Sequence, residues 1–186
     1  MPNEASHQAP LYITHVHRSD LPPALRSRFR DLDQFMRELA ASATARLLVT
    51  APYLSVLGME YLRDAIAVAA GNGASVRVVT GDVNRGGPNF DALQALSSGP
   101  GGLVLRRRCR ILASSELFPV LLHAKLIVAD RERGYLGSAN LSGRALEDNF
   151  EVGVALQPAQ ARSLDDLITY LESQGKLIDR TAEVWS

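Results

Sequence analysis

Two short apolar runs separated by one helical repeat constrain this chain more than any other feature of its sequence. Residues 46–52 and 75–80 are rich in Leu, Val and Thr, as buried strands are. Between them, Met59, Leu62 and Ile66 recur at helical spacing, and glycines follow the repeat. A strand, a helix and a second strand in this order predict two parallel strands joined by a crossover helix.

The remainder of the chain alternates between the same two kinds of element. Strand-like segments cover residues 103–112, 120–129, 134–140 and 150–156, and helix-like segments cover residues 20–43, 89–96 and 158–173. Residues 1–20 are expected to form an arm or an added edge strand. We therefore predict one α/β domain with a central mixed β-sheet flanked by helices on both faces.

Composition limits the compartment and the kind of surface that the chain can offer. One cysteine, Cys109, excludes a disulfide framework and a four-thiolate metal site, and we expect it to be a packed apolar residue. Twenty basic and twenty acidic residues balance to zero formal charge, so an anion-binding surface has to be local. Because the sequence has neither a secretory signal pattern nor an apolar stretch of the roughly 20 residues that span a membrane, we expect a cytoplasmic protein without membrane contact.

The distribution of lysine and histidine singles out one short segment. Only two of the twenty basic residues are lysines, Lys125 and Lys176, and only one of the four histidines, His123, lies beyond residue 17. A chain that uses arginine almost everywhere but lysine beside its internal histidine indicates a need for a compact ammonium there.

The same segment carries a motif of six residue types at defined spacing. It reads H-x-K-x(4)-D-x(6)-G-S-x-N over eighteen residues, and its members are His123, Lys125, Asp130, Gly137, Ser138 and Asn140. This motif resembles the signature of the phospholipase D superfamily, and looser similarity extends from about residue 45 to the closing helix. The chain also resembles the phospholipase D-like components of phage-defence systems of the DISARM type. We accordingly divide it into an N-terminal arm and helix, residues 1–44, and a phospholipase D-like catalytic domain, residues 45–186.

Strand alternation independently predicts that the chemical groups of this region converge. On a strand of period two, His123 and Lys125 share a face, and so do Ser138 and Asn140 on the following strand. On the third strand Glu151 alternates against apolar neighbours, so its carboxylate projects alone. Three adjacent strands thus bring an imidazole, an ammonium, a hydroxyl, an amide and a carboxylate to one anion-sized space.

These five groups suit phosphoryl transfer with no metal and no cofactor. A neutral imidazole at His123 can attack phosphorus, while Lys125, Ser138 and Asn140 stabilise charge on the non-bridging oxygens. Glu151, by accepting from the other ring nitrogen, can hold the attacking tautomer. The resemblance implies a phosphohistidine intermediate and a second histidine that protonates the leaving oxygen.

That second histidine is not available within the body of a single chain, because the sequence holds only one H-x-K pair. Family members with a single copy pair two chains about a twofold axis, as the resemblance implies. We therefore expect a homodimer in which His123 of one chain is the nucleophile and His123 of the other is the acid.

Two further features have competing interpretations. Arg106, Arg107, Arg108 and Arg110 form the densest basic run, which indicates either a nucleic-acid backbone contact or a solvated edge that discourages strand pairing. Asp130 falls on the opposite strand face from His123, and we expect it to cap the turn that follows instead of taking part in catalysis.

The substrate is the least constrained prediction. The superfamily covers nucleases, phospholipases and phosphatidyl transferases, and one catalytic unit serves them all, as the resemblance implies. A compact chain with one motif and local arginines favours a nucleic-acid phosphodiester, DNA before RNA. The alternatives are a phospholipase or phosphatidyl transferase of the same superfamily, and a non-catalytic nucleic-acid-binding subunit that works with other subunits of a defence complex.

Overall fold

The predicted strand, helix and strand form the centre of the fold in a computed structural model that describes residues 11–14, 20–115 and 122–186. The two strands, β3 and β4, pair in parallel, and their residues are almost all buried because the sheet is covered on both faces. The crossover helix α3 begins after Ser55, whose side chain accepts a hydrogen bond from the amide of Gly58. The bounds of this unit are Arg46–Thr50, Val56–Gly71 and Ser75–Thr80.

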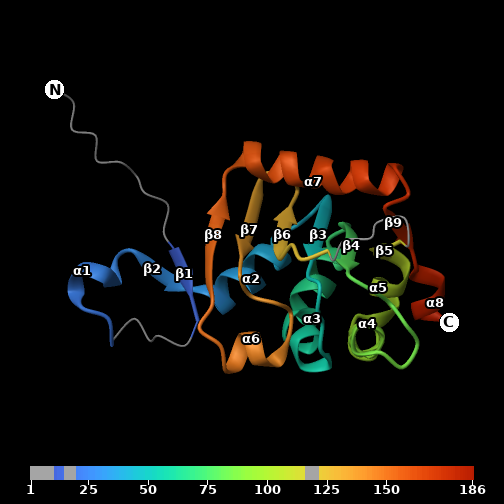
Figure 1. Cartoon of the computed structure of the whole chain (residues 1–186), viewed down its shortest axis with the longest axis horizontal. Helices are drawn as coiled ribbons and strands as arrows, with labels where there is room; N and C mark the ends of the chain where they lie inside the picture. Colours follow the sequence, from blue (N-terminus) through green and yellow to red (C-terminus); the bar gives the residue numbers. More distant parts are fainter. Residues whose placement is uncertain (1–10, 15–19, 116–121) are drawn as a thin grey trace.

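Around this unit the described residues build one mixed sheet of nine strands in the order β2-β1-β8-β7-β6-β3-β4-β5-β9 (Figure 1). β3, β4 and β5 are parallel, whereas β6, β7 and β8 follow as antiparallel neighbours on one side and β9 closes the other side. The remaining strands are β1 Leu11–Ile13, β2 Phe29–Asp31, β5 Cys109–Ser114, β6 Leu126–Ala129, β7 Arg133–Gly137, β8 Val152–Leu156 and β9 Leu177–Asp179.

Helices cover both faces of the sheet, as the sequence predicted. α7 packs on one face through Ala161 and Ile168, against strand residues such as Leu48 and Val128. The other face packs against α2, α3, α4, α5 and α8, and Figure 1 shows α7 alone on the upper side of the sheet. The remaining helices are α1 Pro23–Arg26, α2 Leu32–Ala41, α4 Pro88–Leu96, α5 Gly102–Arg108, α6 Gly143–Glu147, α7 Pro158–Ser173 and α8 Thr181–Trp185. Within the described ranges no helix is both long and apolar enough to cross a membrane.

Two element predictions were wrong. Residues 103–112 are extended only from Cys109 on, because the first part forms α5, which buries Leu105 as it connects two parallel strands. Residues 20–43 do not form one helix. The chain leaves the helical conformation at β2, which pairs in parallel with β1, and α2 then restarts at Leu32. At β2 a strand pairing outweighs a local helical preference, and at α5 the connection between two parallel strands outweighs a local extended preference.

Asp130 joins the end of β6 to the start of β3. Its carboxylate accepts hydrogen bonds from the backbone amides of Thr44, Ala45 and Arg46 at 2.8–3.2 Å and from the Thr44 hydroxyl at 3.0 Å. Burial raises the pKa of Asp130, but these donors together outweigh it and hold the pKa below its ordinary value. Asp130 is therefore structural, although its partners are the amides before β3 and not the turn that follows it.

We expect Asp130→Asn to lower the free energy of unfolding by about 1–3 kcal/mol at neutral pH, because a neutral amide replaces a carboxylate that accepts several amide bonds. Asparagine tolerates the positive φ of 53° found at this position, so backbone strain is not added. A carboxylate whose pKa falls on folding stabilises the protein above its unfolded pKa. The difference from wild type should therefore shrink as the pH falls below about 3.9. Urea denaturation at several pH values measures it, and a pH-independent difference would contradict the assignment.

Candidate active site

The motif residues meet at one edge of the sheet. β6 begins at Leu126, which pairs with Thr50 where β3 ends, and β7 ends where β8 begins. His123 and Lys125 precede β6, Ser138 and Asn140 follow β7, and Glu151 precedes β8. The predicted strands were too long. All five residues lie in the segments just outside the observed strands. Their convergence follows from the antiparallel pairing of β6, β7 and β8.

His123 and Lys125 are in direct contact. The Lys125 ammonium lies 3.3 Å from Nδ1 and 3.2 Å from Nε2 of the His123 ring, and it donates to the His123 carbonyl at 3.2 Å. The imidazole is exposed, whereas Lys125 is only 7% exposed. In a neutral imidazole one ring nitrogen carries the proton and the other carries a lone pair, and the lone-pair nitrogen is the one that can act as a nucleophile.

Burial of Lys125 has an electrostatic consequence. Removal of the ammonium from water lowers the pKa of Lys125, and the negative charge of Glu151 counteracts part of this effect. The charged form of Lys125 thus depends on Glu151, although the two residues are far apart in the sequence.

Glu151 is itself buried and held by two polar side chains. The Ser138 hydroxyl donates to its Oε2, and the Asn149 amide donates to its Oε1 at 3.2 Å. Ser138 Oγ also accepts from the backbone amide of Val152 at 3.1 Å, which ties β7 to β8. Among the hydrogen bonds of these described residues, none joins Glu151 to the His123 ring. Glu151 was expected to accept from a ring nitrogen of His123 and so hold its tautomer. Within one chain the described residues make no such hydrogen bond.

Asn140 brings a free amide to the site. Its Oδ1 is buried and has no hydrogen-bond partner in the part of the chain that the structure describes. A buried acceptor without a partner is costly, so a ligand that donates a hydrogen bond to this oxygen is favoured. The Nδ2 group is the part of the amide that can donate to a phosphate oxygen.

A buried tyrosine shapes the loop that carries Ser138 and Asn140. Tyr135 is 1% exposed, and its Oη accepts from the backbone amide of Ala139 at 3.3 Å. The ring fits only because two neighbouring strand positions are glycines. A Cβ at Gly137 would lie 2.3 Å from Tyr135 Oη, and one at Gly153 would lie 2.2 Å from Cε2 of the ring. Burial raises the pKa of Tyr135, so its phenol stays neutral.

Sequence reasoning missed Tyr53, which presents a half-exposed aromatic ring beside His123. The two ring centroids are 6.4 Å apart in an edge-on arrangement with an interplanar angle of 77°. Asn89 holds this segment, because its Oδ1 accepts from the Leu54 amide at 2.8 Å and its Nδ2 donates to the Pro52 carbonyl at 3.1 Å. The only feature of the sequence that could have indicated this role is the position of Tyr53 directly after the end of a predicted strand.

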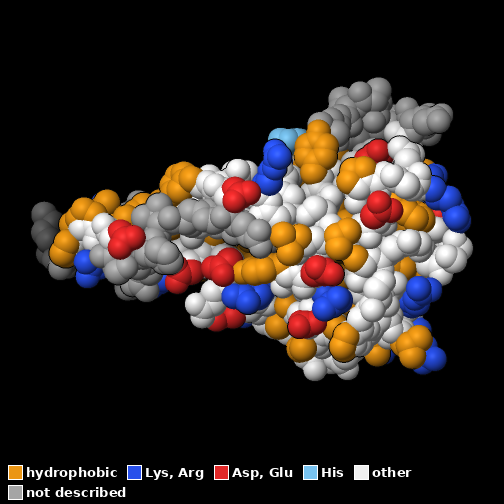
Figure 2. Space-filling view, turned by 90° about the horizontal axis from the view of Figure 1, so that it is seen from below, with side chains coloured by type: hydrophobic (Ala, Val, Ile, Leu, Met, Phe, Trp, Pro, Cys, Tyr) orange, Lys and Arg blue, Asp and Glu red, His pale blue; other side chains and the backbone are white. Residues whose placement is uncertain are grey.

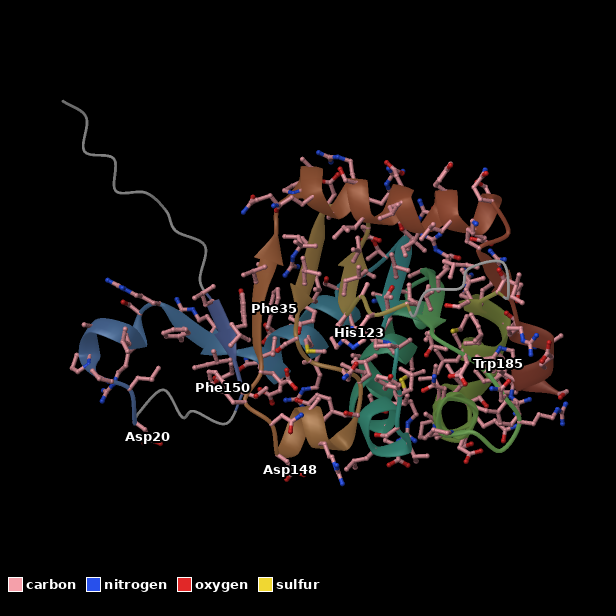
Figure 3. The ribbon with its side chains drawn as sticks, viewed as in Figure 1. Asp20, Phe35, His123, Asp148, Phe150 and Trp185 are labelled. Carbon is pink, nitrogen blue, oxygen red and sulfur yellow. The ribbon has the colours of Figure 1, made fainter. Side chains whose placement is uncertain are left out.

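The predicted arginine cluster lies at the other end of the sheet. Cys109, at the start of β5, aligns through β4 and β3 with Ala129, at the end of β6 that is remote from His123. Arg106 donates to the Trp185 carbonyl at 2.9 Å, and Arg108 donates to the Gly73 carbonyl at 2.8 Å. Figure 3 shows Trp185 and His123 well apart.

The other two arginines of the run are also exposed side chains, and neither is brought to the site. Arg110 pairs with Glu172 and Asp179, whereas Arg107 lies in α5. Cys109 beside them is buried, and burial raises the pKa of its thiol to about 12, which agrees with the predicted packing role. No group of three His, Cys, Asp or Glu residues suited to a metal ion occurs in the described ranges.

A family model described as cardiolipin synthase, PLD-like domain, matches residues 36–173. None of the curated proteins matches the sequence significantly.

Solved structures that share the fold include the following three. Nuc from Salmonella typhimurium, a phospholipase D family member, is 19% identical with a TM-score of 0.59, and the match covers 80% of this chain and 90% of Nuc. NucT from Helicobacter pylori is 17% identical with a TM-score of 0.59 over 92% of this chain and 98% of NucT. Phosphatidylserine synthase from Haemophilus influenzae is 18% identical with a TM-score of 0.56, over 81% of this chain but only 37% of the synthase.

The packing of Tyr135 predicts that Gly137→Ala lowers the free energy of unfolding by about 1–3 kcal/mol, as overpacking of a core does. The new methyl group would meet both Tyr135 Oη and the Val152 carbonyl, at 2.3 Å and 2.6 Å. The matched control is Gly71→Ala, because nothing lies within 4 Å of a Cβ there and alanine favours the helix by up to about 1 kcal/mol. Chemical denaturation compares the two variants. Equal stabilities would contradict the proposed fit of the ring.

Proposed function

Because the chain belongs to the phospholipase D superfamily, through a PLD-like domain at residues 36–173, we propose that it is a metal-independent phosphodiesterase that cleaves nucleic acid with His123 as nucleophile. Its family and its fold neighbours support phosphodiester chemistry in general. The observation that carries the finer proposal is the exposed His123 ring in contact with a buried ammonium, at the same sheet edge as Ser138, Asn140 and Glu151.

The reaction proceeds in two displacements at phosphorus. In the first, a ring nitrogen of His123 forms a bond to phosphorus as the bond to the leaving oxygen breaks, and an acid gives that oxygen a proton. In the second, the group that gave the proton takes one from water, and the hydroxide oxygen displaces the imidazole. Lys125 and Asn140 are placed to bind the non-bridging oxygens, whose charge is greatest in the transition states.

We propose that a second chain supplies the acid. His123 is the only histidine after residue 17, and a nucleophile cannot also protonate the leaving group in the same step. A twofold axis beside the site would place the partner's imidazole opposite the first one.

Exposed apolar side chains near the site support this homodimer. Val56 and Leu57, in the first turn of α3 that follows Tyr53, are 42% and 47% exposed. Figure 2 shows an orange side chain directly beside the pale blue imidazole of His123, the only described histidine. The site of one chain holds only one of the two histidines that the mechanism needs. Exposed apolar side chains beside such a site are suited to packing against a second copy of the chain.

Three observations favour nucleic acid over a lipid. The nucleophile is exposed, so a long polymer can reach it without entering a closed cavity. The half-exposed ring of Tyr53 offers a surface on which a base can stack. The chain also spans nearly all of Nuc and NucT but only 37% of the phosphatidylserine synthase. DNA is the first substrate to test, and partners from a defence system stay a prediction from sequence alone.

The activity test is a panel of single-stranded DNA, duplex DNA, RNA and phospholipid vesicles, each with and without EDTA. We expect cleavage of nucleic acid that EDTA does not reduce and that His123→Ala lowers by at least about 10³-fold, because the nucleophile is removed. Lys125→Arg should also lose most turnover, since a planar guanidinium is broader than an ammonium, whereas Lys176→Arg should keep it.

Each other outcome of this panel contradicts the proposal in a different way. Head-group release without nucleic-acid cleavage would indicate a lipid enzyme. Salt-sensitive nucleic-acid binding without cleavage, unchanged by His123→Ala, would indicate a binding subunit.

The shared site is tested by mixing chains. Wild type refolded with a tenfold excess of His123→Ala should lose about tenfold in activity per wild-type chain, because random pairing leaves only about one wild-type chain in eleven with a wild-type partner. A protein with a complete site in each chain would keep full activity per wild-type chain. The sedimentation coefficient of each sample establishes that pairs have formed.

A further inference from the structure

We propose that Thr14, in the N-terminal arm, is a positioning residue that holds Glu151 in place and thereby supports the site around Lys125. Thr14 lies outside the residues that match the family model, which begin at residue 36. The kinetic part of this inference rests on the proposed phosphodiesterase function, and its electrostatic part does not.

Thr14 makes three hydrogen bonds to the backbone of Asn149 and Glu151. Its hydroxyl accepts from the Glu151 amide at 2.9 Å and donates to the Asn149 carbonyl at 2.7 Å. Its own backbone amide donates to the Glu151 carbonyl at 3.2 Å. Thr14 is buried, so these three hydrogen bonds form away from bulk water, where their loss costs most.

The sheet register explains why this position carries a hydroxyl. In the antiparallel pair of β1 and β8, Ile13 lies opposite Val152, so Thr14 continues the register opposite Glu151. The amide of Glu151 donates to the Thr14 side chain, and the same hydroxyl uses its proton for the Asn149 carbonyl. Serine and threonine both accept and donate through one short hydroxyl side chain, whereas the isosteric valine does neither.

The segment that carries Thr14 is itself held firmly against the rest of the protein, so it can fix the position of Glu151. Tyr12 in β1 stacks on Phe35 of α2 with ring centroids 3.8 Å apart, and β1 pairs with the first half of β8, from Val152 to Val154. Figure 1 shows β1 lying alongside β8, with β2 and α1 extending beyond the body, and Figure 3 shows Phe35 on that side of the molecule. The strand therefore belongs to the same sheet as the site.

The position of Glu151 affects the other site residues through hydrogen bonds and through its charge. Its carboxylate accepts from Ser138 and from Asn149, and its charge raises the pKa of Lys125 against the effect of burial. The groups that act on Lys125 among the described residues are Glu151, through its charge, and His123, by contact. A shift of the backbone at Glu151 would thus weaken both the Ser138 contact and the charged state of Lys125.

The kinetic test compares Thr14→Val and Thr14→Ser with a matched control at a distant threonine. Thr14→Val should lower kcat by about tenfold to a hundredfold with a smaller change in KM, because misplacement of a site group acts mainly on the transition state. The alkaline limb of its pH–rate profile should move to lower pH. Thr14→Ser should restore most of kcat. Thr44→Val also removes a threonine hydroxyl bond, to Asp130, and should leave kcat and the pH profile unchanged.

The electrostatic test needs no substrate. The chain has only two lysines, so protein made with Cε-labelled lysine gives two side-chain NMR signals, and Lys176→Arg identifies that of Lys125. We expect the pKa of Lys125 to fall in Thr14→Val, in the same direction as in Glu151→Gln, and to stay at its wild-type value in Thr14→Ser and Thr44→Val.

The kinetic and electrostatic tests can fail independently of each other. A folded Thr14→Val protein whose Lys125 pKa equals that of Thr44→Val would overturn the role of Thr14, whatever the activity. Circular dichroism establishes that each variant is folded. If the valine variant does not fold, a Lys125 pKa that falls in Thr14→Ser as far as in Glu151→Gln would overturn the role instead. Wild type without phosphodiesterase activity would refute the proposed function, and the lysine titration would still test Thr14.

Discussion

The pairing of β6 with β3 determines where the side chains of the candidate active site lie. Asp130 accepts three backbone amides just before β3 while its own amide donates to Arg46, so the two strands are held in one register at this end. At the far end of the same pair, β6 begins beside the end of β3, and His123 and Lys125 are carried to that edge. Antiparallel neighbours then bring the end of β7 and the start of β8 to the same place.

The site combines exposure of one group with burial of its supports. His123 is open to solvent, whereas Lys125 and Glu151 are each only 7% exposed. The negative charge of Glu151 offsets part of the cost of removing the Lys125 ammonium from water, and the Ser138 hydroxyl donates a hydrogen bond to the Glu151 carboxylate. Rigid packing of Tyr135 over two glycines holds the loop that presents Ser138 and Asn140. Under the proposed function, the Lys125 ammonium and the Asn140 amide would not have to reorganise when charge develops on a phosphate.

The N-terminal segment extends the family domain instead of standing apart from it. α2 packs into the core through Leu32, Met36 and Leu39, and β1 adds to the sheet beside β8. Because β1 runs next to the strand that follows Glu151, an addition at the sheet edge also reaches the site. Thr14 lies outside residues 36–173, which the family model matches.

Local pattern in the sequence determined the strand, helix and strand at the centre, the closing helix at residues 158–173, and the identity of the motif residues, because side-chain period and residue type are local properties. It did not reveal β2, where pairing with β1 overrides a local helical preference, or α5, which connects two parallel strands and buries Leu105. Only the tertiary structure placed Tyr53 against His123, Thr14 against Glu151 and the arginine run at the remote end of the sheet. These contacts join residues separated by as many as 137 positions, and hydrogen bonds across such separations depend on strand order and register, which no local period encodes.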